Sequence, residues 1–105
     1  MANSWVMALR RVCKKAELPS GNSVHIDDPE IAVFNLDGKF FAIADVCTHD
    51  QARLSDGELA GDTIICPWHG ACFSVRTGEA LSPPAVEAVE TFPVVLKEDY
   101  IYIEL

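Results

Sequence analysis

Two short pairs of cysteine and histidine constrain the fold of this 105-residue chain more than any other feature. Cys47 and His49 are separated by one residue; Cys66 and His69, which follow after an interval of sixteen residues, are separated by two. Side chains two apart in an extended segment point to the same side, whereas side chains three apart need a turn, for which Pro67 is suited. The chain must therefore bring two loops face to face if these four side chains are to meet.

Two thiolates and two imidazoles at one point form a set of metal ligands. Tetrahedral zinc takes the same four groups, but zinc modules usually place both cysteines in one element and both histidines in the other. Here each loop supplies one Cys and one His, which suits a two-iron cluster with both cysteines on one iron and both histidines on the other. The spacing favours one [2Fe–2S] cluster per chain and leaves a zinc-binding module as the alternative.

Outside these loops the dominant period is two, which is typical of β-strands. The strand-like runs are Trp5–Val12, Ile31–Leu36, Lys39–Val46, Thr63–Cys66, Cys72–Val75, Phe92–Lys97 and Tyr100–Leu105. Asp37-Gly38 and Glu98-Asp99 separate neighbouring runs and predict tight hairpin turns. We expect an all-β fold, an antiparallel sandwich or barrel, with a loop-built subdomain over about residues 46–84 inserted between early and late strands.

Composition and charge narrow the class of function. A chain of this length has room for one domain, residues 1–105, and half of its residues are hydrophobic, as in a folded globular protein. Sixteen acidic and eight basic residues give a net charge of −8, which argues against nucleic acid or an anionic membrane as partner. No apolar run is long enough to span a membrane, and basic residues follow the N-terminal apolar stretch instead of preceding it, so we expect a cytoplasmic protein with reduced cysteines.

At the Cys/His pairs the chain resembles the Rieske iron–sulfur proteins, whose motif is C-x-H followed by C-x₂-H. The longer stretch CPWHGACFSVRTGEALSPP is also similar to this family, and the flanking strands fit the family's β-fold over nearly the whole chain. The resemblance implies that Cys47 and Cys66 bind a buried iron. It also implies that His49 and His69 bind the second iron at an exposed tip, where electrons enter and leave.

Three further residues are expected beside the cluster. Trp68 lies between two expected ligands and either shields the cluster or contacts a partner, with packing of its own loop as the alternative. Gly70 is expected to permit a close approach of the backbone to bridging sulfide. Pro83 belongs to Ser82-Pro83-Pro84, which resembles the proline loop that covers the cluster in this family; a plain strand connection is the alternative.

The remaining candidates for chemistry are given structural roles. Cys13 and Cys72 are expected to act as small buried apolar residues. His25, in a polar stretch before two aspartates, is expected to be a solvated surface histidine. With the other two histidines assigned to the cluster, only His25 remains, so the chain cannot supply the two-histidine, one-carboxylate iron site of an oxygenase. We therefore expect that it is not an enzyme by itself.

The residues around the motif indicate where the reduction potential lies. With two thiolates the oxidised centre is neutral, so it accepts an electron more easily than a four-cysteine centre, and Rieske potentials span about −150 to +300 mV. High-potential members of the family carry a disulfide between the two loops and hydroxyl groups after the second histidine. The matching positions here are Ala52, Trp68, Ala71 and Phe73. The resemblance thus implies a low potential, near or below about −150 mV.

Taken together, the resemblance implies a soluble one-electron carrier, a Rieske-type ferredoxin of a bacterial aromatic-ring-hydroxylating dioxygenase system. Such a carrier passes electrons from a flavin-dependent NAD(P)H reductase to a terminal oxygenase. It involves neither nucleic acid nor membrane, and a monomer suits its shuttling. A Rieske-like small subunit of an assimilatory nitrite reductase is the alternative.

Overall fold

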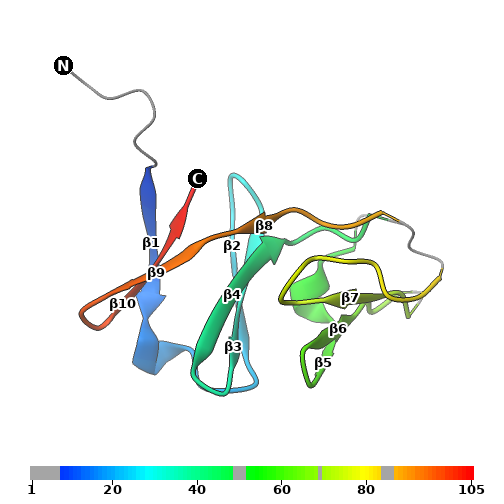
Figure 1. The fold of residues 1–105 in the computed structure, drawn as a ribbon, viewed down its shortest axis with the longest axis horizontal. Coiled ribbons are helices and arrows are strands. Elements are labelled where there is room, and N and C mark those ends of the chain that lie inside the picture. The colour runs from blue at the N-terminus through cyan, green and yellow to red at the C-terminus, as the bar shows by residue number, and fades with distance from the viewer. Residues whose placement is uncertain (1–7, 49–51, 69, 84–86) are drawn as a thin grey trace.

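The computed structural model describes residues 8–48, 52–68, 70–83 and 87–105, which form three antiparallel sheets (Figure 1). One sheet lies near both chain ends, the second lies in the middle, and the third lies at the opposite end of the molecule. Helical structure in this part of the chain is limited to two single turns of 3-10 helix, Lys15–Glu17 (η1) and Leu54–Asp56 (η2). The predicted all-β class is confirmed, and no helix of the described residues is long and apolar enough to cross a membrane.

The third sheet is inserted into the second. The first sheet has the order β1-β10-β9, with β1 Leu9–Lys14, β9 Val94–Lys97 and β10 Tyr100–Glu104. The second has the order β2-β3-β4-β8, with β2 Ser23–Ile26, β3 Ile31–Leu36, β4 Lys39–Ala44 and β8 Thr91–Phe92. The third has the order β5-β6-β7, with β5 Glu58–Ala60, β6 Thr63–Ile65 and β7 Cys72–Ser74. Since β4 and β8 pair directly, the chain leaves the second sheet and returns to it at neighbouring strands.

Strand β3 lies in the second sheet between β2 and β4, and all six of its residues are buried. Because successive side chains of a strand point to opposite faces, β3 contributes to two apolar clusters. Phe34 belongs to the cluster shared with the third sheet, whereas Val33 belongs to the cluster shared with the first sheet. A strand buried on both faces is an almost continuous apolar run, which explains the sequence IAVFNL.

The predicted hairpin between β3 and β4 is confirmed at Asp37 and Gly38. The two residues have φ angles of 53° and 89°, the left-handed geometry of a type I′ turn, which aspartate and glycine adopt most readily. Leu36 pairs with Lys39 directly beside the turn. The second predicted turn, between β9 and β10, is also present, and Glu98 has a φ of 56° there.

Several predicted strands have different ends in the structure. The run predicted as Phe92–Lys97 is interrupted at Pro93, which has no amide hydrogen to donate, and its two parts belong to different sheets. The strand predicted to extend to Val46 ends at Ala44, because Asp45 leaves the sheet. The first strand extends to Lys14 instead of ending at Val12, while the predicted start at Trp5 lies outside the described residues.

The sequence did not predict β2 and β5. Both are short: β2, SVHI, has four residues and β5, ELA, has three, so any alternation of apolar and polar residues is too brief to mark a half-buried strand. They form through pairing with β3 and β6, whose own sequences are strongly β-prone.

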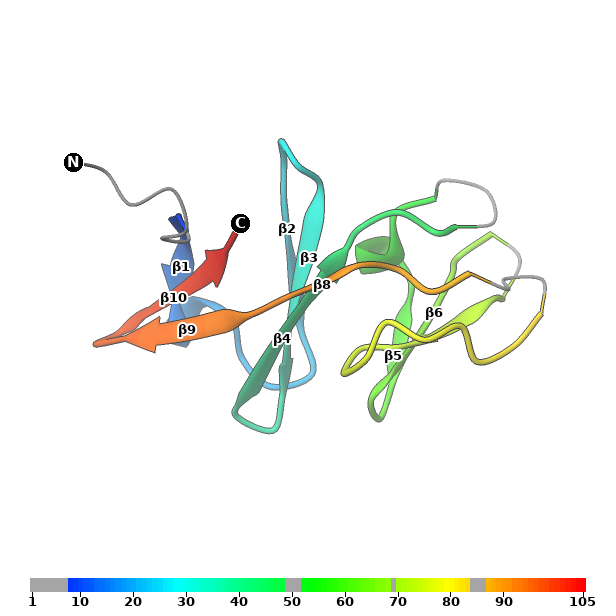
Figure 2. The ribbon, with the colours of Figure 1, turned by 45° about the horizontal axis from the view of Figure 1, so that its top comes forward.

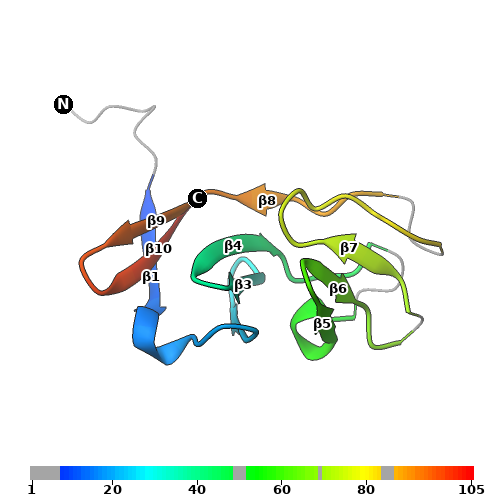
Figure 3. The same ribbon diagram turned by 60° about the horizontal axis from the view of Figure 1, so that its bottom comes forward.

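After β7 the chain folds back against the third sheet before it returns to β8 (Figures 2 and 3). Phe73 of β7 forms an isolated bridge with Ala80, and the amide of Leu81 donates to the carbonyl of Cys72 at 2.7 Å. This return segment carries the proline loop, so the loop is tied to the strand that follows the second Cys/His pair.

Candidate metal centre

The two loops that carry the Cys/His pairs are closed in the same way. The first begins at Cys47, whose amide donates to the carbonyl of Ala52 at 2.8 Å. The second begins at Cys66, whose amide donates to the carbonyl of Ala71 at 2.7 Å. Each loop therefore starts at a cysteine and closes on an alanine five residues later, although the spacing of Cys and His differs between the two. His49 and His69 lie outside the described residues.

The residues that begin and close each loop are buried, whereas the described residues directly after each cysteine are exposed. Cys47 and Cys66 are 1% and 2% exposed and belong to the same apolar cluster as Phe34. Ala52 and Ala71, at the closing ends, are equally buried. In contrast, the residues that follow each cysteine, including Thr48 and Pro67, are exposed.

This arrangement fits a two-iron cluster. It places two cysteine sulfur atoms inside an apolar core, at the starts of two loops that close in the same way, and the described residues directly after each cysteine are exposed. Thiolates are the ligands that iron–sulfur clusters take, and a centre with one buried and one exposed end needs such a pair of loops. The residues that the structure describes therefore fit the cofactor expected from the sequence.

The structure locates the residues expected beside the cluster. Trp68 is 64% exposed, so it is not a buried packing residue of its loop. Gly70 has a φ of 72°, which favours glycine, and its amide donates to the carbonyl of Cys66 at 3.2 Å. The hydroxyl of Ser82 accepts a hydrogen bond from the amide of Cys72, and Pro83 next to it is exposed. Pro84 lies outside the described residues.

The two cysteines outside the pairs are not in disulfides and are less buried than expected. Cys13 lies at the edge of the apolar cluster beneath the first sheet, where burial raises the pKa of its thiol, with a smaller contribution from Glu17. Cys72 is partly exposed, with its sulfur 3.5 Å from the carbonyl oxygen of Gly70.

The prediction for His25 was wrong: its side chain is only 16% exposed. Strand β2 places His25 beside Asp45, with 2.5 Å between Nδ1 and a carboxylate oxygen. Its Nε2 lies 2.9 Å from a carboxylate oxygen of Asp27. The contact depends on β2, which the sequence did not reveal. The sequence held one signal for this contact: Asp45 follows the apolar run of β4, and an acidic residue buried there needs a polar partner.

These contacts raise the pKa of His25. Partial burial acts to lower it, but the hydrogen bonds to Asp45 and Asp27, together with the negative charge of Asp45, outweigh burial and the opposing charge of Arg53. Since a carboxylate oxygen can only accept, both ring nitrogens carry hydrogen when both contacts are made. The folded protein therefore favours the charged imidazolium.

His25, Asp27 and Glu30 also place three donor atoms within reach of one metal ion, a grouping found among the described residues. Arg53 lies 3.9 Å from Asp27 and 3.6 Å from Glu30, so a cation already faces both carboxylates. This grouping is distinct from the two loops, and nothing in it suits iron–sulfur chemistry.

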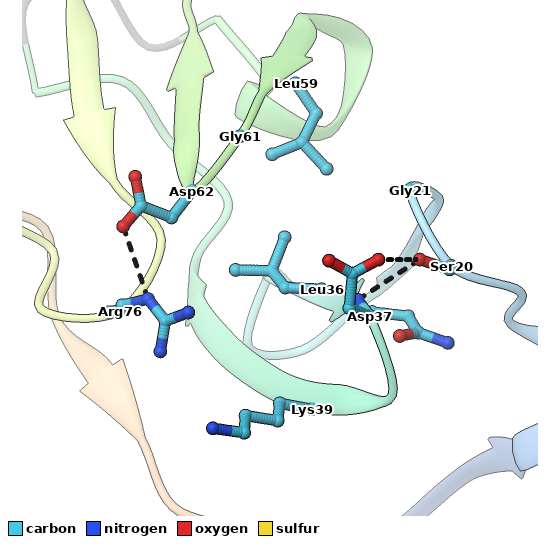
Figure 4. Close-up of a pocket in the computed structure, with 10 residues that line it drawn as sticks. Ser20, Gly21, Leu36, Asp37, Lys39, Leu59, Gly61, Asp62 and Arg76 are labelled. Atoms are coloured by element: carbon cyan, nitrogen blue, oxygen red, sulfur yellow. Dashed lines mark hydrogen bonds and ion pairs between the residues drawn. The ribbon is translucent and has the colours of Figure 1, made fainter.

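A cleft of about 660 Å³ lies between the β3–β4 turn and the β5–β6 turn (Figure 4). Three of its charged residues have polar partners: Arg76 binds Asp62 at 3.2 Å, and the hydroxyl of Ser20 donates to Asp37 at 3.1 Å. Neither Cys nor His is among its lining residues. The candidate centre is therefore the pair of loops and not this cleft.

Fold and site together define an all-β protein with two matched, cysteine-bearing loops at one end. Residues 8–93 match the family model described as Rieske [2Fe-2S] domain. The chain therefore belongs to the Rieske [2Fe–2S] domain family. The cofactor is accordingly a Rieske-type [2Fe–2S] cluster, which removes the zinc-binding alternative.

Individual relatives agree over nearly the full length of the chain. The 3-phenylpropionate/cinnamic acid dioxygenase ferredoxin subunit of Photorhabdus laumondii is 46% identical over 94 residues, covering 88% of this chain and 90% of that protein. Sphingomonas yanoikuyae B1 ferredoxin superposes with a TM-score of 0.87 at 34% identity, covering 93% of this chain and 99% of that one. A chain from the complex of reduced oxygenase and oxidized ferredoxin in carbazole 1,9a-dioxygenase superposes with a TM-score of 0.88 at 34% identity, covering 91% and 92%.

The raised pKa of His25 can be measured directly by NMR. We expect the ring-proton shifts of His25 to titrate with a midpoint above 6.5, its ordinary value, and Asp27→Asn to lower that midpoint. Because the folded-state pKa is raised, the interaction stabilises the fold fully below pH 6.5, and the stabilisation is lost as the pH rises through the folded pKa. Asp37→Asn, which removes a remote carboxylate, serves as the control. A wild-type midpoint at or below 6.5 would contradict this account.

Proposed function

We propose that this chain is the ferredoxin of a bacterial aromatic-ring dioxygenase system and that it carries single electrons to a terminal oxygenase. The observation that carries this proposal is its near full-length similarity to a dioxygenase ferredoxin subunit, in a chain whose loops fit a redox cluster. The carrier takes no part in the reaction with substrate. The sequence identity to dioxygenase ferredoxin subunits favours this function over the nitrite reductase alternative.

We further propose that Cys47, His49, Cys66 and His69 are the four ligands. When bound, the cluster supplies reversible one-electron chemistry. The chain's own contribution is to bury the two cysteines in an apolar core and to expose the loop tops to a partner. Trp68, which is largely exposed between two of the proposed ligands, is suited to contact that partner.

The proposed electron donor is a flavin-dependent NAD(P)H reductase, and the proposed state is a cytoplasmic monomer with one Rieske domain over residues 1–105. A monomer with one exposed tip must bind its donor and its acceptor in turn, so the two complexes have to be short-lived. The insertion between β4 and β8 supports a cluster-binding subdomain over about residues 46–84.

The charge distribution supports docking through the loop end of the molecule. Residues 18–93, which build the second and third sheets and both loops, contain twelve acidic and three basic residues. The flanking segments that build the first sheet contain five basic and four acidic residues in the described part of the chain. The negative charge is thus concentrated toward the loops, and it would steer that end to a basic surface on a partner protein.

Replacement of a proposed histidine ligand tests the site. His69→Ala should abolish the visible and EPR spectra of the cluster, because one iron loses a ligand. The wild-type protein should contain about two iron and two sulfide per chain. His25→Gln removes the one histidine outside the pairs and is the control for the presence of the cluster alone: it should keep the iron content. A normal spectrum in His69→Ala would refute the ligand assignment.

The reduction potential is a separate prediction. We expect protein-film voltammetry at neutral pH to give a value near or below about −150 mV. The positions that would carry stabilising groups in high-potential relatives hold Ala52, Ala71 and Phe73, all buried and all without a hydroxyl or a thiol. A strongly positive potential would show that other groups stabilise the reduced form.

Reconstitution tests the function as a whole. A candidate reductase and a 3-phenylpropionate/cinnamic acid oxygenase should hydroxylate substrate at the expense of NADH only when this protein is added. The cluster-free protein, prepared by removing iron, is the control and should give no product. Turnover that is unchanged when the protein is omitted would contradict the proposal.

The same assay carried out at rising ionic strength separates specific docking from non-specific reduction. Turnover should fall as salt screens the acidic loop end from its partner. A rate that does not depend on salt would contradict electrostatic steering while leaving the carrier function intact.

A further inference from the structure

Asp45 is the only charged side chain among the described residues that is fully buried, with 0% exposure. It follows β4 directly and lies two residues before Cys47. Burial of a carboxylate costs several kcal/mol unless hydrogen bonds and an opposite charge compensate it. A buried carboxylate does not itself carry electrons, so the burial of Asp45 beside the first loop needs a structural explanation.

Both oxygens of Asp45 are engaged by three donors. The amide of Ser55 donates to one oxygen at 2.7 Å, and the hydroxyl of Ser55 donates to the other at 2.5 Å. The Nδ1 of His25 contacts the same oxygen as the hydroxyl. Hydrogen bonds to an ionised acceptor are the stronger kind, so the three together hold the carboxylate firmly.

Asp45 and Ser55 stand at the two ends of the first loop. The loop from Cys47 to Ala52 lies between them, closed by its own backbone hydrogen bond. The hydrogen bonds between Asp45 and Ser55 therefore close the loop a second time, outside the backbone bond between Cys47 and Ala52. We name the three residues Asp45, Ser55 and His25 the carboxylate clamp.

The clamp also fixes the loop to the second sheet. His25 belongs to β2, where it pairs with Ala32 of β3. The amide of Asp45 donates to the carbonyl of Glu30 at 3.0 Å, just before β3 begins. The base of the first loop is thus attached to the second sheet by a side chain, at β2, and by the backbone, just before β3.

On its other side the clamp reaches the second loop. Gly57, two residues after Ser55, packs so closely on β6 that an added Cβ would lie 1.9 Å from the carbonyl oxygen of Ile65. Ile65 is followed directly by Cys66. A continuous series of contacts therefore runs from Asp45 through Ser55 and Gly57 to the start of the second loop.

We propose that Asp45 is a positioning residue for the cluster: held by Ser55 and His25, it sets the placement of the first ligand loop relative to the second. The inference rests on the ligand assignment proposed above. It predicts that the clamp governs the geometry of the centre, and not only the stability of the fold, because both loops are positioned through it.

The test compares iron-loaded variants of the clamp with a matched control. Asp45→Asn keeps the size of the side chain but turns an amide NH₂ group toward two donors, and Ser55→Ala removes one of the two bonds from Ser55. Asp37→Asn is the control, because Asp37 is also a carboxylate bonded to a serine, Ser20, but lies in the remote β3–β4 turn (Figure 4). Asparagine tolerates the positive φ at that position.

We expect Asp45→Asn and Ser55→Ala to bind iron but to show shifted EPR g values and a shifted midpoint potential, while Asp37→Asn matches the wild type in both. Hydrogen exchange in peptides covering residues 45–57 should be faster by about tenfold, the factor that corresponds to losing a charge-assisted hydrogen bond. Ser55→Thr, which keeps the hydroxyl, should restore the wild-type g values.

Wild-type g values and potential in both clamp variants, even with a lowered melting temperature, would overturn the inference and leave the clamp a purely structural feature. If Asp45→Asn fails to bind iron, Ser55→Ala decides the question, since it retains the carboxylate and the amide bond. Failure of the ligand assignment is distinguished by His69→Ala, which would then keep its spectrum whatever the clamp variants do.

Discussion

The structure depends on one apolar cluster that joins the second sheet to the third. Phe34 of β3 and Phe73 of β7 are both completely buried in it, and so are the two cysteines that begin the loops. The thiols are thus part of the hydrophobic core, so the free energy that folds the domain also brings the two loops together. The packing of the core therefore holds the two cysteines in place, and it also keeps water away from their sulfur atoms.

The sequence predicted the parts of this arrangement that local pattern determines. The Cys/His spacing indicated the two loops, IAVFNL indicated a strand, and Asp37-Gly38 indicated a tight hairpin turn. Each of these signals lies within a few adjacent residues, where alternation, turn chemistry and ligand spacing act directly.

The parts that were not predicted depend on contacts between distant residues. His25 was expected to be solvated, yet it binds Asp45, twenty residues away, because β2 forms along the edge of β3. The alternation within β2 covers only four residues, which is too few to predict a strand, and the matching closure of the two loops appears only when the backbone is folded. Pro93 was visible in the sequence, but that it divides one run between two sheets follows from the topology.

The ends of the insertion meet at neighbouring strands, since β4 and β8 pair through Ala42–Phe92 and Ile43–Thr91. A segment that enters and leaves a sheet at adjacent positions can change in length or sequence without displacing the strands on either side. The exposed residues of the loop end can therefore vary, and with them the redox partner that is recognised, while the β4–β8 pairing at its base stays the same.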